Sequence, residues 1–103
     1  MNKTKALALA RDLARRDKIA FTTHAKKRNP KAGKYPLSRE QVKECVLRGQ
    51  ITEGPYPDVG NSGWKFTMKR FADTENHEAV LIIKEDVLVI LVVTAYATSG
   101  KRR

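Results

Sequence analysis

One stretch, from Asp86 to Tyr96, constrains the fold more than any other because it is an almost unbroken run of strand-forming residues. Its two alternating sets of side chains are Val87, Val89, Leu91, Val93, Ala95 and Leu88, Ile90, Val92, Thr94, Tyr96. Both sets are apolar until the end, which is typical of a central strand covered on both faces. The second set then brings the Thr94 hydroxyl and the Tyr96 phenol to one face, where a strand can hold a site rigidly.

The residues before this strand first show helical patterns. Apolar residues at helical spacing predict a helix over residues 3–16, and Ser38 with Gln41 forms a capping box for a helix that ends at Gly49. The apolar segment 19–21 leads to Thr22 and Thr23, whose hydroxyls can cap a short helix that begins at His24. Residues 31–36 are expected to form a basic loop, because they contain Gly33 and end at a proline.

Alternating patterns follow, with strands expected over residues 51–56, 64–71 and 78–84 before the central one. The connections are too short for parallel crossovers, so these strands are expected to be antiparallel. The sequence therefore predicts an α+β domain, with N-terminal helices packed on one face of a four-stranded antiparallel twisted sheet. Depending on the register, the opposite face would expose Lys65, Lys69, Thr94 or Tyr96.

The chain carries a formal net charge of +10, and most of this charge lies in the N-terminal third. Residues 1–34 contain eleven Lys and Arg against two Asp, whereas residues 35–103 contain ten Lys and Arg against nine acidic residues. Such a segregated positive field favours an anionic partner. Nucleic acid fits better than a membrane surface, because no large apolar face accompanies the charge.

Cysteine and histidine usage limits the possible chemistry. Cys45 is the only cysteine, which excludes an intrachain disulfide and a cysteine-based metal site and favours a reducing, cytoplasmic compartment. It lies on an apolar helical stripe, so we interpret it as a core residue and not as a nucleophile. His77 stands in an acidic turn, where we expect it to be exposed and without a role. No metal, other cofactor or transmembrane helix is expected.

The best candidates for chemistry are His24 and Arg28, which lie four residues apart on one face of the short helix. Metal-free cleavage of RNA needs a base for the 2′-hydroxyl, a proton donor for the leaving oxygen and groups that stabilise the charged phosphorane. His24, Arg28, Thr94 and Tyr96 could supply these groups if the short helix lies over the end of the last strand. The alternative is that His24 only caps or packs the helix and that its basic neighbours are solvated.

A wider set of basic residues is expected to bind the nucleic-acid backbone: Arg15, Lys26, Lys27, Lys31, Lys34, Lys65, Lys69 and Arg70. The alternative for the charges on the first helix is a solvated face. Tyr56 and Trp64 are interpreted as core or turn anchors in preference to platforms for base stacking.

The chain resembles a small bacterial domain of unknown function whose members begin with Ser/Thr-x-His-Ala-x-x-Arg and end in a Val-rich strand closing on Thr-x-Tyr. The matching residues are Thr22, His24, Ala25, Arg28, Ile51-Thr52-Glu53 and Val92-Val93-Thr94-Ala95-Tyr96. It is also similar to metal-independent ribonuclease toxins of the RelE and BrnT types. The resemblance implies an RNA-cleaving toxin-like core over residues 19–98, within one domain that adds a basic helix at 1–18 and a basic tail at 99–103.

The leading hypothesis is a small metal-independent ribonuclease, as the toxin of a toxin-antitoxin pair or an effector module. Its expected partners are RNA and an acidic antitoxin or immunity protein, and the sequence does not define an oligomeric state. One alternative is a module that binds nucleic acid without cleaving it. The other is a basic domain that binds or inhibits another protein.

Overall fold

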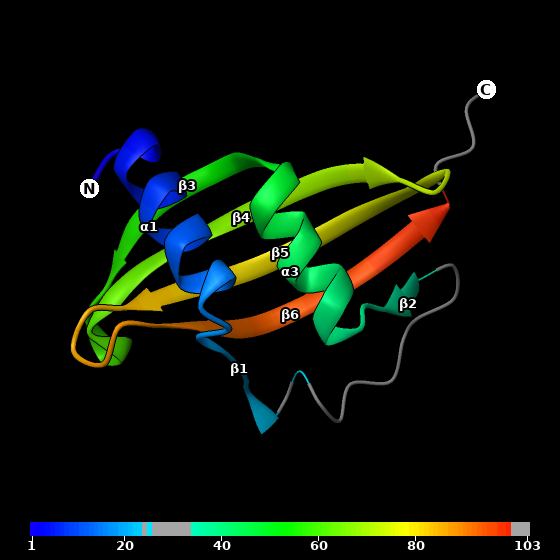
Figure 1. The fold of residues 1–103 in the computed structure, drawn as a ribbon. Coiled ribbons are helices and arrows are strands. Elements are labelled where there is room, and N and C mark those ends of the chain that lie inside the picture. The colour runs from blue at the N-terminus through cyan, green and yellow to red at the C-terminus, as the bar shows by residue number, and fades with distance from the viewer. Residues whose placement is uncertain (24, 26–33, 100–103) are drawn as a thin grey trace.

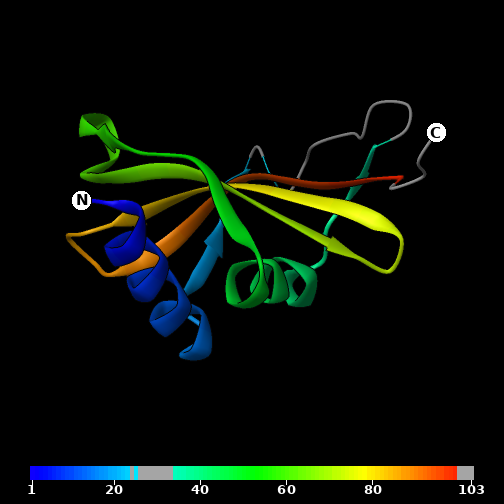
Figure 2. The same ribbon diagram turned by 90° about the horizontal axis from the view of Figure 1, so that it is seen from above.

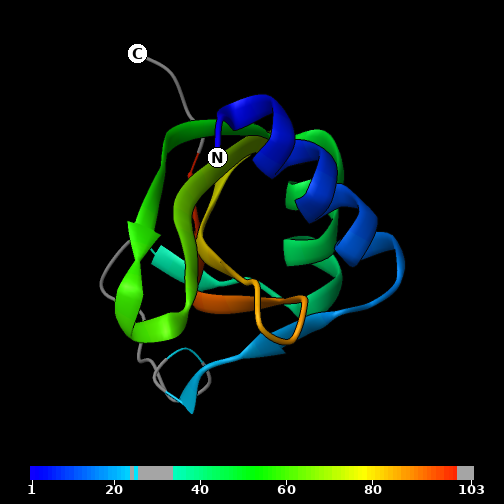
Figure 3. The same cartoon turned by 90° about the vertical axis from the view of Figure 1, so that its left-hand side faces the viewer.

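The computed structural model describes residues 1–23, 25 and 34–99 and shows an α+β fold with helices on one face of a sheet (Figure 1). Figure 2 shows both helices on the same side of the sheet, and Figure 3 shows the sheet curving partly around them. The elements in chain order are α1 Lys3–Arg15, β1 Ile19–Phe21, β2 Lys34–Pro36, α3 Arg39–Arg48, β3 Gln50–Asp58, the short 3-10 helix η1 Val59–Asn61, β4 Gly63–Ala72, β5 Glu75–Lys84 and β6 Val89–Ser99.

Helices α1 and α3 begin where the sequence predicts, at residues whose side chains satisfy free backbone N–H groups. The Asn2 side chain accepts a hydrogen bond of 2.8 Å from the backbone N–H of Lys5 at the start of α1. Ser38 and Gln41 form the expected capping box at the start of α3. Gly49 ends α3 beside β4, where a Cβ atom would lie 2.7 Å from the carbonyl oxygen of Lys69. A side chain at this position would therefore push the helix away from the sheet.

The strands that the structure describes form one sheet in the order β1-β6-β5-β4-β3, with β2 also paired to β6. The four expected strands are present as an antiparallel meander, and β6 is central as predicted. The prediction of a four-stranded, wholly antiparallel sheet is wrong in one respect. Two short strands, β1 in parallel and β2 antiparallel, pair with β6 along the edge that β5 leaves unoccupied.

Each of these added strands has only three residues, which is too few to show an alternating pattern. The apolar segment Ile19–Phe21 forms β1, and the last residues of the expected basic loop, Lys34–Pro36, form β2. In β2, Lys34 stands opposite Thr98 and Pro36 opposite Tyr96. A proline is tolerated there because β2 is an edge strand. Pairing with a long apolar neighbour stabilises segments that have no strand signal of their own.

The core lies between the sheet and the helices α1 and α3. Phe66, Met68, Leu81 and Ile90 are among the largest buried side chains, and they alternate along β4, β5 and β6 with residues on the other face. The helices contribute Ala10, Leu13, Val42, Cys45 and Val46. We call the sheet face that contacts α1 and α3 the inner face, and the opposite one the outer face.

A β-bulge in β6 sets which residues reach the outer face. Leu81 pairs with Val92, whereas the preceding residue Val80 pairs with Thr94, so Val93 is an extra residue in β6. Before the bulge Ile90 and Val92 are buried, and after it Ala95 and Ala97 are buried. Strict alternation would keep Thr94 and Tyr96 on the same face as Val92. The bulge shifts the alternation by one residue and turns both side chains outward.

Among the described residues, none of the helices has the length and apolar character needed to cross a membrane.

Candidate functional site

The outer face carries four side chains whose face the sequence alone does not determine. They are Lys65, Lys69, Thr94 and Tyr96. Lys65 and Lys69 alternate with the buried residues Phe66 and Met68 of β4, so they point away from the helices. Lys69 stands opposite Glu78 of β5, and Glu78 stands opposite Tyr96 of β6. Thr94 lies two residues before Tyr96 on the same face. All four are therefore on the outer face.

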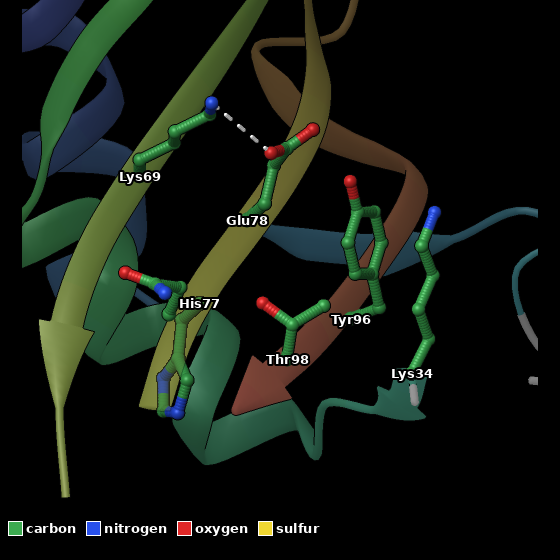
Figure 4. Close-up of a pocket in the computed structure, with 7 residues that line it drawn as sticks. Lys34, Lys69, His77, Glu78, Tyr96 and Thr98 are labelled. Atoms are coloured by element: carbon green, nitrogen blue, oxygen red, sulfur yellow. Dashed lines mark ion pairs between the residues drawn. The ribbon is translucent and has the colours of Figure 1, made fainter. Parts of the chain in front are cut away.

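A hollow of about 390 Å³ lies on this face where β2, β4, β5 and β6 meet. Figure 4 shows Tyr96 between Lys34 on one side and Glu78 with Lys69 on the other. The lining residues are Lys34, Lys69, Asn76, His77, Glu78, Tyr96 and Thr98. Two ammonium groups, one carboxylate and several hydroxyl or amide groups thus surround one space.

Two contacts position the charged groups around the hollow. The Lys69 Nζ atom lies 3.4 Å from Glu78 Oε1, and the Lys34 Nζ atom lies 4.4 Å from the centroid of the Tyr96 ring. The second contact is a cation–π interaction, which stabilises an ammonium group over an aromatic face. Strand β2 brings Lys34 to this place, because Lys34 is paired with Thr98. The hollow therefore presents both signs of charge next to a phenol.

The remaining described residues of the expected site are dispersed. Lys65 is on the outer face but further along β4, opposite Ile82. Arg70 lies on the inner face, where its Nη1 atom is 3.9 Å from Glu44 Oε1 of α3. Arg15 is exposed on α1, on the helix side of the sheet. The structure thus brings Lys34, Lys65 and Lys69 to one face and places Arg15 and Arg70 on the other side.

His24, Arg28, Lys26, Lys27 and Lys31 lie outside the described residues. The short helix expected from His24 lies there as well. The structure describes one contact of the predicted helix cap. The backbone N–H of Ala25 donates a hydrogen bond of 3.0 Å to Thr22 Oγ1. This is the geometry expected of a threonine that caps a helix. The roles of His24 and Arg28 stay predictions.

Glu78 is the charged residue of the hollow that the sequence does not indicate, and Asn76 and Thr98 are two further lining residues of this kind. The alternation of Glu78 with Ala79 and its place opposite Tyr96 depend on the register of the β5–β6 hairpin. Partners directly opposite on antiparallel strands have Cβ atoms about 4.5–5.5 Å apart. A hairpin alignment of Glu78 with Tyr96 was the signal that could have found this carboxylate.

The expectation that His77 is exposed is wrong, because its ring is buried on the inner face at 1% exposure. The β4–β5 turn contains only Asp73 and Thr74, both with positive φ, so β5 begins at Glu75 and position 77 faces inward. His77 Nε2 is 3.1 Å from Glu75 Oε1, and the buried Nδ1 atom has no hydrogen-bond partner. Figure 4 shows the ring on the opposite side of β5 from Tyr96.

Cys45 is a buried core residue, as the sequence predicts. Burial raises the pKa of its thiol from the ordinary value of 9.0 to about 11, with a smaller opposing effect of Arg70 and a further rise from Glu78. The thiol is therefore protonated at neutral pH and is a poor nucleophile. Within the described part of the chain, no three His, Cys, Asp or Glu side chains gather as a metal site would require.

Comparison of the chain with protein-family models, with curated proteins and with solved structures yields no match. Two ammonium groups next to a hollow favour an anionic ligand, and a carboxylate with a phenol can exchange protons with it.

Proposed function

We propose that this protein cleaves RNA without a metal ion, at the hollow on the outer face of the sheet. The observation that carries the proposal is the placement of Tyr96 and Glu78 on paired strands, with the ammonium groups of Lys34 and Lys69 next to them. Acid, base and phosphate-binding groups are the three requirements of this reaction. The chain's net charge of +10 favours association with a polyanion.

In the proposed reaction a base removes the proton of a ribose 2′-hydroxyl, and the resulting oxyanion attacks the adjacent phosphorus. The bond from phosphorus to the 5′-oxygen breaks, and a proton donor neutralises that oxygen. The products are a 2′,3′-cyclic phosphate and a 5′-hydroxyl. Glu78 is the described candidate for the base, Tyr96 for the proton donor, and Lys34 with Lys69 for stabilising the phosphorane charge.

The motif shared with the small bacterial domain supplies two further candidate residues for this reaction. His24 is the second candidate for the base and Arg28 for binding the phosphate, as in the motif shared with the small bacterial domain and the RelE and BrnT types of toxin. We propose on the same basis that an acidic antitoxin or immunity protein inhibits the chain by covering the lysines of the outer face. Such a protein would compete with RNA for Lys34 and Lys69.

The direct test is digestion of RNA by the purified chain in EDTA, with the product ends analysed. Cleavage that leaves 2′,3′-cyclic phosphate is expected, and removal of the acid or base should slow it by about a hundred to ten thousand fold. Tyr96→Phe and Glu78→Gln test the described residues, and His24→Ala and Arg28→Ala test the predicted ones. Intact RNA with the parent chain, or full activity in all four variants, would refute the proposal.

Two substitutions that remove a carboxylate and a phenol hydroxyl away from the hollow serve as matched controls. Glu40→Gln removes an exposed carboxylate in the first turn of α3, on the helix side of the sheet. Tyr35→Phe removes a phenol hydroxyl on β2, where Tyr35 pairs with the inward-facing Ala97. Both controls should cleave like the parent chain. Equal losses in controls and site variants would indicate a general effect on folding.

The second candidate function is binding of nucleic acid without cleavage. The ion pair between Lys69 and Glu78 favours it, because a carboxylate held by an ammonium group also serves as a cross-strand contact with no chemical role. In that case RNA would be retained with a steep dependence on salt and recovered uncut.

A further inference from the structure

The outer face exposes aromatic rings that the proposed cleavage reaction does not use. Phe71 in β4 is 62% exposed and Tyr56 in β3 is 58% exposed. The interpretation of Tyr56 as a core or turn anchor is therefore wrong, whereas Trp64 is half-buried on the inner face of β4, opposite Ile83. The Phe71 and Tyr56 rings therefore both offer an exposed aromatic surface on which a ligand can stack.

The two rings lie along the lysines of β4. Phe71 follows Lys69 by two residues on the same face, about 6.6 Å along the strand at the usual rise per residue. Tyr56 stands directly opposite Lys65. We call Tyr56, Lys65, Lys69 and Phe71 the outer track. Tyr56 thus lies beside Lys65 at one end of the track, and Phe71 lies beyond Lys69 at the other end.

The presence of aromatic rings next to lysines distinguishes between the possible ligands of the outer track. A hydrophobic protein partner is disfavoured, because lysine is depleted in the cores of protein interfaces and here interrupts the apolar surface. A duplex is disfavoured as well, because its bases are stacked on each other and cannot stack on a protein ring. Unpaired nucleotides meet both features, since their phosphates bind lysines while their bases stack on aromatic rings.

We propose that the outer track binds single-stranded RNA, with unpaired bases stacked on Phe71 and Tyr56 and phosphates bound by Lys65 and Lys69. This inference rests on the proposed function, because it extends the substrate from the hollow along β4. It adds that the substrate is unpaired and that recognition tolerates many sequences, since every base has a face that can stack.

The test measures binding separately from cleavage. A short fluorescent 2′-O-methyl RNA, which has no free 2′-hydroxyl and cannot be cut, is titrated with the chain as a single strand and as a duplex, and anisotropy is recorded. Stacking predicts tighter binding of the single strand and a loss of about tenfold in affinity for Phe71→Ala. Phe71→Trp should keep the affinity, and Phe71→Leu should lose it although it remains apolar.

Tyr35→Ala is the matched control, because Tyr35 is 57% exposed but lies on the other side of the sheet from the track. It should bind like the parent chain. The inference is overturned if no RNA binds, if the duplex binds as tightly as the single strand, or if Phe71→Ala binds like the parent. Binding that depends on Phe71 in a chain that cleaves no RNA would refute the proposed function and leave this inference standing.

Discussion

The inner and outer faces of the sheet are formed by alternate residues of the same strands, yet they differ in what their side chains contact. On the inner face Phe66, Leu81 and Ile90 are buried against the helices. On the outer face Lys69, Glu78 and Tyr96 surround a hollow. The inner face thus holds the fold together and the outer face carries the proposed function, so a change on one face should leave the property of the other intact.

The largest loss of stability is expected when the two faces of a strand are exchanged by deletion of one residue. Deletion of Thr67 in the middle of β4 would turn Lys69 and Phe71 toward the helices. The deletion would bury the Lys69 ammonium group or expose the buried Met68, and each change costs several of the roughly 5–15 kcal/mol that stabilise a small domain, so cooperative urea unfolding should be lost. Thr67→Ala, which keeps the alternation, should unfold cooperatively.

Deletion of Val93 is the matched counterpart, because it removes the extra residue of the bulge. The pairs of Val80 with Thr94 and of Leu81 with Val92 can then follow each other in a regular ladder, with Tyr96 still on the outer face. This variant should unfold cooperatively with native-like amide spectra. Unfolding of the Val93 deletion together with a stable Thr67 deletion would contradict the assigned faces.

A second comparison uses two phenylalanines of β4 on opposite faces. Phe66 is 1% exposed and Phe71 is 62% exposed. Phe66→Ala should lower the free energy of unfolding by about 3–5 kcal/mol, because it leaves a cavity in the core. Phe71→Ala should change it by no more than about 0.5 kcal/mol. Urea denaturation of both variants measures the difference, and equal losses would contradict the separation of the faces.

The buried thiol of Cys45 makes the stability of the inner face depend on pH. The folded state holds the thiol proton more tightly than the unfolded state, because burial raises the pKa from 9.0 to about 11. This contribution is fully present below pH 9 and is lost as the pH rises toward 11. The free energy of unfolding should fall by roughly 2–3 kcal/mol more in the parent chain than in Cys45→Ala between these values. Identical slopes would show that the thiol is not buried.

The smallest effect on stability is expected for the ion pair of the outer face. Lys69 is largely exposed, so Lys69→Met should change the free energy of unfolding by less than about 1 kcal/mol. The same variant should reduce the salt dependence of RNA affinity by about one phosphate contact. Lys5→Met on α1 is the control, and it should change neither property. An unchanged salt dependence in Lys69→Met would exclude this lysine from the RNA-binding surface.

The sequence predicts much of this architecture, because its signals are long or local. The helix over residues 3–16, the capping box at Ser38 and the meander up to the central strand all rest on such patterns. Strands β1 and β2 could not be predicted, since three residues carry no period and their pairing with β6 is a tertiary contact. The inward position of His77 depends on a turn of two residues, which the polar composition around it does not reveal.

The candidate site was predictable only in part, because local patterns reveal neither the β-bulge nor the pairing of the strands. Thr94 and Tyr96 do share one face, but strict alternation assigns them to the face of Val92, and only the extra residue Val93 turns them outward. Glu78 and Lys34 join the site through strand pairing across the sheet, which a single sequence does not encode locally. Arg70, which the sequence groups with the nucleic-acid-binding residues, lies on the helix side of the sheet, where it contacts Glu44.

An amide chemical-shift titration of the parent chain with the single-stranded 2′-O-methyl RNA is the decisive test of whether the outer face binds RNA. We expect the largest shifts on the outer-face residues Lys34, Lys65, Lys69, Phe71 and Glu78, while α1 and α3 change little. Largest shifts on the two helices, with β4 and β5 unchanged, would contradict the assignment of function to the outer face.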